Sequence, residues 1–385
     1  MTAGAERASR ARRVTHLPWR RLAAVDWVLL VAVLAALAAG TAMIYSATLR
    51  GEAVERLWDD LVVKQLVFAL ISILVLVLFA LTEYRVLLAL HLWIYGAMLI
   101  PLVLLPTVGQ TMLGARRWFT AGGIALQPSE LTKIAMIIFL AAYFERHDIR
   151  RVRTVVGSLA FVGLAMFLVL IQPNLSTAIL LGFIWLGMAF AAGIRPVHLS
   201  ILVFGAAPLA WLALTSQLIK AYQLDRIRFW LNPEADPGFR GYQAIQTVIA
   251  VGNGGMWGTG YASGMQAQGG WLVVPFTDNI FAIVAEELGF VGSLAFLSLL
   301  FFILQRIFRA ARSAQDYPGG LIIAGVGTYL TAQIFVNIGV VLQIFPVTGI
   351  SLPFISYGGS SLIAAMAAIG MVQSVLLRRR PLEFR

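Results

Sequence analysis

Ten long apolar segments divide the chain, and they restrict its fold more than any other feature. Each has about 20 residues, the length that an α-helix needs to cross a hydrocarbon core about 30 Å thick. Only 12% of the residues are charged and 60% are hydrophobic, which excludes a water-soluble globule. The runs are apolar on all sides instead of alternating, so a closed barrel of strands is excluded as well. The sequence predicts an all-α, polytopic integral membrane protein with about ten transmembrane helices, at residues 25–45, 61–81, 86–105, 129–144, 154–171, 175–193, 198–214, 279–304, 320–344 and 352–377.

Arginine residues predict the orientation of these helices. With the N-terminus inside, 19 of the 29 basic residues lie in the tails and loops on the inner side. Lys and Arg bias short loops toward the cytoplasm, so both termini are expected there. We predict a basic cytoplasmic tail (1–24), a membrane domain (25–378) and a cytoplasmic C-terminal tail (379–385). The stretch 215–278 is expected to form a large extracytoplasmic loop before the eighth helix.

Composition also removes several kinds of chemistry. The chain has no Cys, which excludes disulfides, thiolate metal sites and cysteine nucleophiles. Its four His never cluster, and motifs for nucleotide hydrolysis or zinc catalysis are absent. The net charge is +11, but the basic residues lie in clusters between apolar runs. Neither a metal site nor a nucleic-acid partner is therefore expected.

Acidic residues at the start of the eighth span are the first candidates for a site, because charge inside a membrane is costly. Asp278 comes where the long loop enters this span, and it has an alternative interpretation as a helix N-cap. On a helix, Glu286 lies about 80° around the axis from Asp278 and Glu287 about 180°. Glu286 is therefore expected to share the cavity of Asp278, and Glu287 to pair with another helix. For both glutamates a structural ion pair is the alternative.

A second set of charged residues belongs to the predicted outer side. Glu130 and Lys133 are three residues apart on one helix, where they can either pair with each other or line a polar cavity. Lys64, Arg117, Arg226, Arg228 and Arg240 are further outward cations. Cations on this side oppose the usual charge bias, and they suit an anionic substrate such as a phosphate or pyrophosphate. Solvated surface is the alternative for those in the long loop.

Two segments rich in small residues complete the survey. Eight glycines fall within residues 252–270, and they could either cradle a phosphate or form a mobile loop. Residues 345–361, which read FPVTGISLPFISYGGSS, are explained by close helix packing.

Four motifs resemble one known family when they are taken together and in order. They are GARRWF with QPSELTK at residues 114–133, the stretch from Arg226 through Asn232 to Gln243, TDNIFAIVAEELG at 277–289, and PVTGISLPFISYGGSS at 346–361. The chain resembles the SEDS family (shape, elongation, division and sporulation), which includes RodA, FtsW and SpoVE. The resemblance covers nearly the whole chain after the basic tail.

The resemblance implies a peptidoglycan glycosyltransferase that polymerises lipid II at the outer face of the bacterial cytoplasmic membrane. It implies a single-span class B penicillin-binding transpeptidase as partner. Asp278 matches the catalytic acid of the family, and Arg226 matches a basic position of its outer loop. The positions that line its central cavity are matched by Lys64, Arg117, Glu130 and Lys133. No tightly bound cofactor is implied, although a divalent cation, Mg²⁺ or Mn²⁺, could bridge the pyrophosphate.

The chain departs from the family pattern at two positions, and other functions remain open. Asn174 stands where an Asp is usual, and Phe276 stands where a His is usual. Either the missing acid is dispensable, or the chain is a divergent paralogue. The alternative functions are a flippase for the lipid-linked precursor and a non-catalytic scaffold for the transpeptidase. The motifs fall between the elongation and division branches.

Overall fold

The structure is a computed structural model of the chain, and it describes residues 24–49, 60–112, 115–121, 124–202, 204–205, 221–235, 241–272 and 274–378. Most of the basic tail, Arg240, Gly114 and much of the predicted seventh span lie outside the described residues.

Helices make up nearly all of the regular structure, with one small sheet between α6 and α7. The long helices are α3 (Trp27–Thr48), α4 (Leu61–Leu81), α6 (His91–Val108), α7 (Pro128–Arg146), α8 (Val152–Ile171), α9 (Leu175–Ala191), α14 (Ile280–Arg312), α15 (Tyr317–Val341) and α16 (Gly359–Leu377). The short elements are α5 (Tyr84–Ala89), α11 (Ala221–Leu231), η2 (Pro233–Ala235), α12 (Tyr242–Asn253), α13 (Met265–Gln268), β1 (Gln110–Met112), β2 (Ala115–Ala121) and β3 (Ile124–Leu126). Residues 196–202 are also helical.

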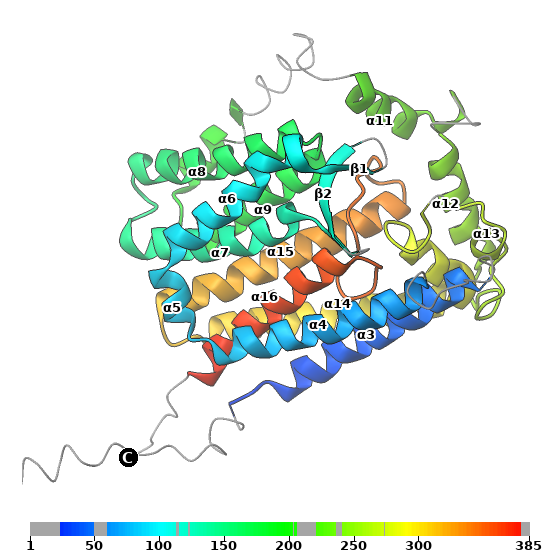
Figure 1. Cartoon of the computed structure of the whole chain (residues 1–385), viewed down its shortest axis with the longest axis horizontal. Helices are drawn as coiled ribbons and strands as arrows, with labels where there is room; N and C mark the ends of the chain where they lie inside the picture. Colours follow the sequence, from blue (N-terminus) through cyan, green and yellow to red (C-terminus); the bar gives the residue numbers. More distant parts are fainter. Residues whose placement is uncertain are drawn as a thin grey trace, which may run out of the picture.

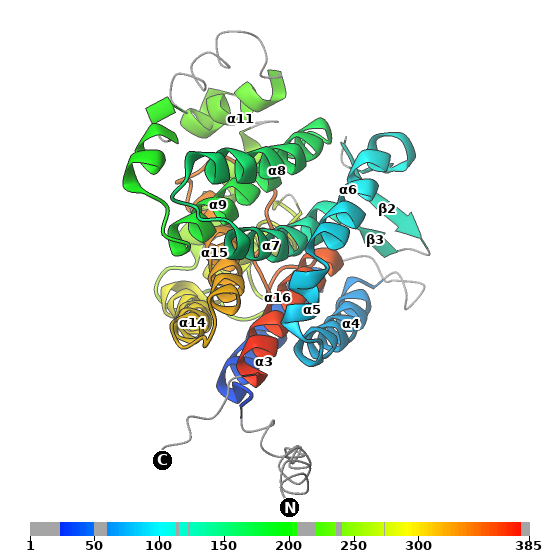
Figure 2. The ribbon, with the colours of Figure 1, turned by 90° about the vertical axis from the view of Figure 1, so that its left-hand side faces the viewer.

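The long helices lie side by side as a bundle, with α16 in its interior (Figures 1 and 2). Among the described residues, seven helices are long and apolar enough to cross a membrane: α3, α4, α6, α8, α14, α15 and α16. The apolar helix α9 is shorter, at 17 residues, and α7 contains the charged pair Glu130 and Lys133. The structure is that of a multi-pass membrane protein, and the total of ten spans stays a prediction.

Small residues allow the helices around α16 to approach closely. The sequence predicted close packing for residues 345–361, which lead into this helix. A Cβ on Gly359 would lie 2.4 Å from the ring of Phe68 on α4, and one on Gly370 would lie 2.5 Å from the carbonyl of Leu76. Lipid tails are as apolar as Leu, so burial of apolar surface does not hold such helices together in a bilayer. Close backbone contact does, and it explains why α4 packs along α16.

Helix α14 is broken at Gly289 (φ 67°, ψ −166°), which the apolar pattern did not predict. In a regular helix the amides of residues 290 and 291 would donate to the carbonyls of residues 286 and 287. Here the amide of Phe290 donates to Gly255 O (2.9 Å) and that of Val291 to Met256 O (3.2 Å). The two freed carbonyls instead accept from the amides of Thr259 (3.0 Å) and Gly260 (3.1 Å). The loop after α12 therefore supplies partners for the four backbone groups of two missing helical hydrogen bonds.

Glycine is required at this contact because backbone meets backbone. A Cβ on Gly254 would lie 1.8 Å from Ala285 O, and one on Gly258 would lie 2.1 Å from Glu287 O. The glycine run thus packs against α14. The sequence left open a phosphate cradle or a mobile loop for this run. Neither describes residues 254–260, because their backbone packs against α14 and forms hydrogen bonds with it.

The prediction of an all-α chain is wrong for residues 110–126, where β1, β2 and β3 form an antiparallel sheet in that order. Gln110 pairs with Trp118 while Thr111 pairs with Arg116, so Arg117 is the extra residue of a β-bulge. A bulge redirects the side chain at that position. The strands are too short to show an alternating pattern in the sequence.

Polar contacts join the helix ends near the first described residues. Asp26 caps α3 (2.9 Å to the amide of Leu29) and pairs with Arg306 of α14 (2.6 Å). Asp316 caps α15 and accepts from the hydroxyl of Tyr84 (2.5 Å). The ends of α3, α5, α14 and α15 are thereby tied at one end of the bundle, whereas α11, α12 and α13 lie toward the other (Figure 1).

The predicted orientation can be tested with single cysteines, since the native chain has none. Ala235 and Ser313 are both exposed and lie in the predicted outer loop and an inner loop. We expect an impermeant thiol reagent on intact spheroplasts to label Ala235→Cys and to leave Ser313→Cys unlabelled until the membrane is permeabilised. The reverse pattern would place Asp278 on the cytoplasmic side.

Candidate functional site

Asp278 lies in the turn of residues 275–279 that precedes α14. The N-cap of α14 is Asn279, and no side chain makes a capping hydrogen bond there. The interpretation of Asp278 as a helix cap is therefore not supported, and its carboxylate remains available for another role.

The backbone around Asp278 is fixed by the C-terminal part of the chain. Three consecutive carbonyls in this turn, which belongs to no helix or sheet, each accept a hydrogen bond from a distant donor. The pairs are Tyr357 N–H to Phe276 O (2.8 Å), the Ser356 hydroxyl to Thr277 O (2.6 Å) and the Asn337 amide to Asp278 O (2.9 Å).

The surroundings of the Asp278 carboxyl favour a proton acceptor that titrates near neutral pH. The residue is partly exposed, and its Oδ2 lies 3.5 Å from the position of a Cβ on Gly349. Burial raises the pKa of this carboxyl from 3.8 to about 6, although the Thr277 hydroxyl and the charges of Arg226 and Arg117 act in the opposite direction. Two cations are thus close enough to influence a carboxylate that protein partly removes from water.

Arg117 reaches this region because the bulge in β2 directs it there. Its guanidinium donates to the carbonyls of Gln172 (3.1 Å) and Pro173. The next residue, Asn174, is the N-cap of α9, and its side chain accepts from the amide of Thr177 (3.3 Å). Asn and Asp cap helices about equally well, so the cap at this position does not need an ionised acid. Asn174 therefore meets the helix-capping requirement at this position.

Glu130 and Lys133 form the predicted pair, with 2.7 Å between the Lys133 Nζ and the Glu130 Oε2. Lys133 is fully buried and Glu130 is 8% exposed. The ammonium also donates to Gln333 Oε1 (3.3 Å) and lies 4.9 Å from the centre of the Tyr329 ring. Its donors face protein groups, so the expectation that Lys133 lines an open substrate cavity does not fit its burial.

Glu286 has partners that do not fit the expectation that it shares the cavity of Asp278. Its two carboxylate oxygens accept from the amides of Gln266 (2.7 Å) and Ala267 (3.1 Å) at the start of α13. The break at Gly289 brings that loop against α14, which an unbroken helix would not do. Glu287 contacts another helix, as predicted: the hydroxyl of Ser46 on α3 lies 2.5 and 2.7 Å from its oxygens. This contact is a hydrogen bond instead of an ion pair.

The remaining predicted cations are less defined. Lys64 is partly exposed on the first turn of α4, and Arg228 is exposed on α11. Arg226, also on α11, lies within electrostatic reach of Asp278. The Trp230 indole, on the same helix, donates to Gln343 O (2.9 Å), which joins α11 to the end of α15. Among the predicted cations in the described part of the chain, Arg117 and Arg226 are thus the two that the structure connects with Asp278.

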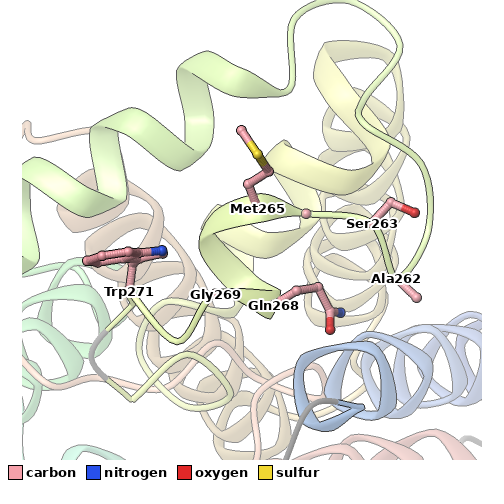
Figure 3. Close-up of a pocket in the computed structure, with 7 residues that line it drawn as sticks. Ala262, Ser263, Met265, Gln268, Gly269 and Trp271 are labelled. Atoms are coloured by element: carbon pink, nitrogen blue, oxygen red, sulfur yellow. The ribbon is translucent and has the colours of Figure 1, made fainter.

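A surface pocket of about 480 Å³ lies on the loop that contains α13 (Figure 3). Asp278 is not among the residues that line it. Met265, Gln268 and Trp271 line it. The carboxylate beneath it, that of Glu286, is already bonded to the backbone of the loop. This pocket offers an apolar surface without a free acid or base.

Metal-binding clusters of three or more His, Cys, Asp or Glu side chains are not found among the described residues. Around Asp278 the charged groups identified are Arg117 and Arg226. The two arginines can donate to an anion, whereas one carboxylate beside two arginines does not fit a cation held by protein ligands alone.

Comparison with known proteins identifies the family. A family model described as "Cell cycle protein", which takes its name from FtsW, RodA and SpoVE, matches residues 26–380. The chain belongs to the FtsW/RodA/SpoVE family. The resemblance inferred from the sequence motifs is thereby confirmed.

Several curated family members are similar over most of their length. A probable peptidoglycan glycosyltransferase FtsW of Trichlorobacter lovleyi is 35% identical over 92% of this chain and 94% of its own. Stage V sporulation protein E of Bacillus subtilis is 39% identical over 72% and 75%. The peptidoglycan glycosyltransferase MrdB of Escherichia coli is 37% identical over 76% and 79%.

Solved structures of this family share the fold. One chain of a peptidoglycan synthase complex, described as coordinating polymerization and crosslinking, superposes with a TM-score of 0.77 at 31% identity. It covers 91% of this chain and 97% of its own. The rod shape determining protein RodA of Thermus thermophilus superposes with a TM-score of 0.68 at 29% identity, over 91% and 96%.

Three residues that the sequence did not predict make hydrogen bonds to the turn of Asp278 or to the loop beside it: Gln333, Asn337 and Ser356. Gln333 and Asn337 are polar residues in an apolar span, four residues apart and thus on one face of α15. That spacing was a usable signal, because an amide inside a membrane helix requires a partner. Ser356 belongs to a segment for which close packing alone was predicted.

The pair of Glu130 and Lys133 gives a testable dependence. Removal of one partner from a buried pair leaves an uncompensated charge and costs about 3–5 kcal/mol in soluble proteins, whereas replacement of both can be nearly neutral. We therefore expect Lys133→Met to lower the melting temperature more than the double variant Glu130→Gln, Lys133→Met. The melting temperatures of both single variants and of the double variant are measured in detergent. If the decreases caused by Glu130→Gln and Lys133→Met simply add in the double variant, the two side chains do not stabilise each other.

Proposed function

We propose that this protein is a peptidoglycan glycosyltransferase that polymerises lipid II at the outer face of the bacterial cytoplasmic membrane, with Asp278 as general base. The curated relatives named above support the activity, since two of them are named as peptidoglycan glycosyltransferases. The observation that carries the role of Asp278 is its position as a partly exposed carboxyl beside Arg117 and Arg226, with a pKa raised to about 6.

The proposed reaction needs one base and a means to stabilise a leaving anion. The hydroxyl oxygen of the acceptor sugar attacks the anomeric carbon of the donor, and the bond between that carbon and the pyrophosphate oxygen breaks. The hydroxyl proton passes to Asp278, and the electron pair of the broken bond leaves with undecaprenyl pyrophosphate. A base with a pKa near the working pH suits this proton transfer.

Arg117 and Arg226 supply the second requirement. Cations aimed at the oxygen on which charge develops lower the barrier most where water is partly excluded. The bulge of β2 presents Arg117, and α11 presents Arg226. In this reaction the two arginines stabilise the departing pyrophosphate.

Single displacement with inversion follows from the use of one carboxylate. A retaining mechanism requires a second carboxyl about 5–5.5 Å from the first as nucleophile. The nearby candidate from sequence, Glu286, is bonded to the loop backbone instead. An α-linked donor would therefore give a β-linked glycan.

A class B penicillin-binding transpeptidase is the proposed partner. The complex with a similar chain is described as coordinating polymerization with crosslinking. New glycan released at the outer face would need crosslinking there, which a single-span enzyme on the same membrane can perform.

Replacement of Asp278 tests the role of base. Asp278→Asn keeps the shape and removes a partly buried charge, so we expect a melting temperature at or slightly above that of wild type. A general base contributes about 10²–10⁴-fold to rate, and the variant should make almost no glycan from lipid II with the transpeptidase present. Asp60→Asn is the matched control, because Asp60 caps α4 through the amide of Val62 (2.7 Å) and Asn retains that function.

Full polymerisation by Asp278→Asn would overturn the assignment of the base. Wild-type protein that makes no polymer but carries labelled lipid II across liposome membranes would overturn the proposed glycosyltransferase activity altogether. Wild type that does neither, yet raises the activity of the transpeptidase, would be a scaffold.

The pH dependence of the rate gives an independent test. A base acts in its ionised form, so activity is lost as the pH falls through the pKa of Asp278. Since burial raises that pKa to about 6, the acid limb of kcat/KM should have its midpoint near pH 6. A midpoint near the ordinary value for Asp, about 3.9, would contradict the burial of the carboxyl in the working enzyme.

A further inference from the structure

We propose that Asn337 is a positioning residue for Asp278, and that Gln333 connects the buried pair of Glu130 and Lys133 to the same loop. Neither amide would contact substrate. Both would act by fixing the segment 346–351 against the turn of Asp278. The kinetic part of this inference rests on the proposed function, whereas the structural part does not.

Asn337 joins two segments that are far apart in the chain. Its side chain is 1% exposed, and Nδ2 donates to Asp278 O (2.9 Å) and to Ile350 O (2.7 Å). Two carbonyl acceptors require the NH₂ end of the amide, so the orientation of the side chain is determined. Its Oδ1 is buried without a hydrogen-bond partner in the described part of the chain. The two hydrogen bonds donated by Nδ2 therefore determine the position of the side chain.

The two carbonyls that accept from Asn337 belong to the two segments that meet at the Asp278 carboxyl. Its Oδ2 lies 3.5 Å from the position of a Cβ on Gly349, and Gly349 has a φ of +73° that other residues rarely adopt. Ile350, whose carbonyl Asn337 binds, follows Gly349 directly. Asn337 thus fixes Asp278 on one side of this contact and the Gly349 loop on the other.

Gln333 makes the equivalent contact one turn earlier on α15. Its Nε2 donates to the carbonyl of Ser351 (2.9 Å), the residue after Ile350. Its Oε1 faces the ammonium of Lys133 (3.3 Å). An ammonium can only donate, so Lys133 sets which end of the Gln333 amide faces the loop. The ion pair on α7 thereby orients the amide that binds the segment beside Asp278.

This arrangement connects the buried pair of Glu130 and Lys133 to the segment beside Asp278 through Gln333. Lys133 cannot reach a substrate through its present contacts, but it can orient Gln333. Gln333 and Asn337 then bind the consecutive carbonyls of Ser351 and Ile350, so the loop is fixed at two adjacent peptide groups. A small displacement of a catalytic group can lower a rate about 10²-fold.

The charged groups that influence Asp278 are Arg226 from α11 and Arg117 from β2, and both favour its ionised form. Burial acts against them. Loss of the Asn337 contacts would release the turn toward water and reduce the effect of burial, so the pKa of Asp278 would fall toward its ordinary value. A loss of packing elsewhere in α15 would not produce this shift.

The test compares Asn337→Ala, Asn337→Ser and Gln333→Leu with Thr331→Val. Thr331 lies on the same helix, and its hydroxyl donates to Gly327 O within α15 (2.7 Å). Full-length protein with its transpeptidase partner is assayed for kcat, KM and the acid limb with lipid II. In parallel, a carbodiimide labels protonated carboxyls as a function of pH, and peptide mass spectrometry reads the labelling of Asp278 without any need for activity.

For Asn337→Ala we expect a kcat at least about tenfold lower, a KM within about twofold, and a labelling midpoint below that of wild type. Asn337→Ser can donate to only one carbonyl, so it should fall between wild type and Ala and serves if Ala does not fold. Gln333→Leu should shift both readouts in the same direction but less, and Thr331→Val should shift neither.

A variant with a lower melting temperature but an unchanged labelling midpoint and kcat would overturn the inference. So would a midpoint that moves equally in Thr331→Val. If wild type makes no polymer, the proposed function fails while the labelling midpoints still decide whether Asn337 positions Asp278.

Discussion

Every backbone polar group inside a bilayer needs a protein partner, and the structure depends on how this requirement is met where the helices stop. Regular helices satisfy it internally. The turn of Asp278 and the segment 346–357 belong to no helix, yet much of the latter is buried. Hydrogen bonds from Asn337, Ser356 and Tyr357 complete the turn. The irregular backbone that carries Asp278 is therefore completed by donors from α15 and the C-terminal loop.

The break in α14 meets the same requirement in a second way. Gly289 interrupts the helix, and the glycine run after α12 exchanges two pairs of backbone hydrogen bonds with it. Because the exchange brings main chain against main chain, a side chain on Gly254 or Gly258 would prevent it. The carboxylate of Glu286 then receives the amides of the same loop. The loop of residues 254–267 is thus joined to the helical bundle by hydrogen bonds on both sides of the break.

Buried charged side chains in the described part of the chain meet a related requirement, because each has a hydrogen-bond partner beside it in the fold. Glu130 has Lys133, Glu286 has two amides, and Glu287 has the Ser46 hydroxyl. These groups are stabilising elements of the bundle. Asp278 differs because its carboxyl is partly exposed and is influenced by the charges of Arg117 and Arg226. This difference in environment, more than the presence of charge, distinguishes the proposed base from the structural acids.

The sequence by itself determined the class of protein and most of the helices, and it selected Asp278 as the candidate base. Apolar runs of about 20 residues have one stable form in a bilayer, and the motif around Asp278 is local in the chain, so both can be recognised without coordinates. It did not determine the break at Gly289, the bulge at Arg117 or the roles of Asn337 and Gln333. Each of these depends on a partner far along the chain, such as Asn337 with Asp278 or Arg117 with Gln172. Apolar periodicity carries no information about such pairs. Only the tertiary structure decided which polar groups meet, because a buried donor takes the acceptor that packing brings within reach.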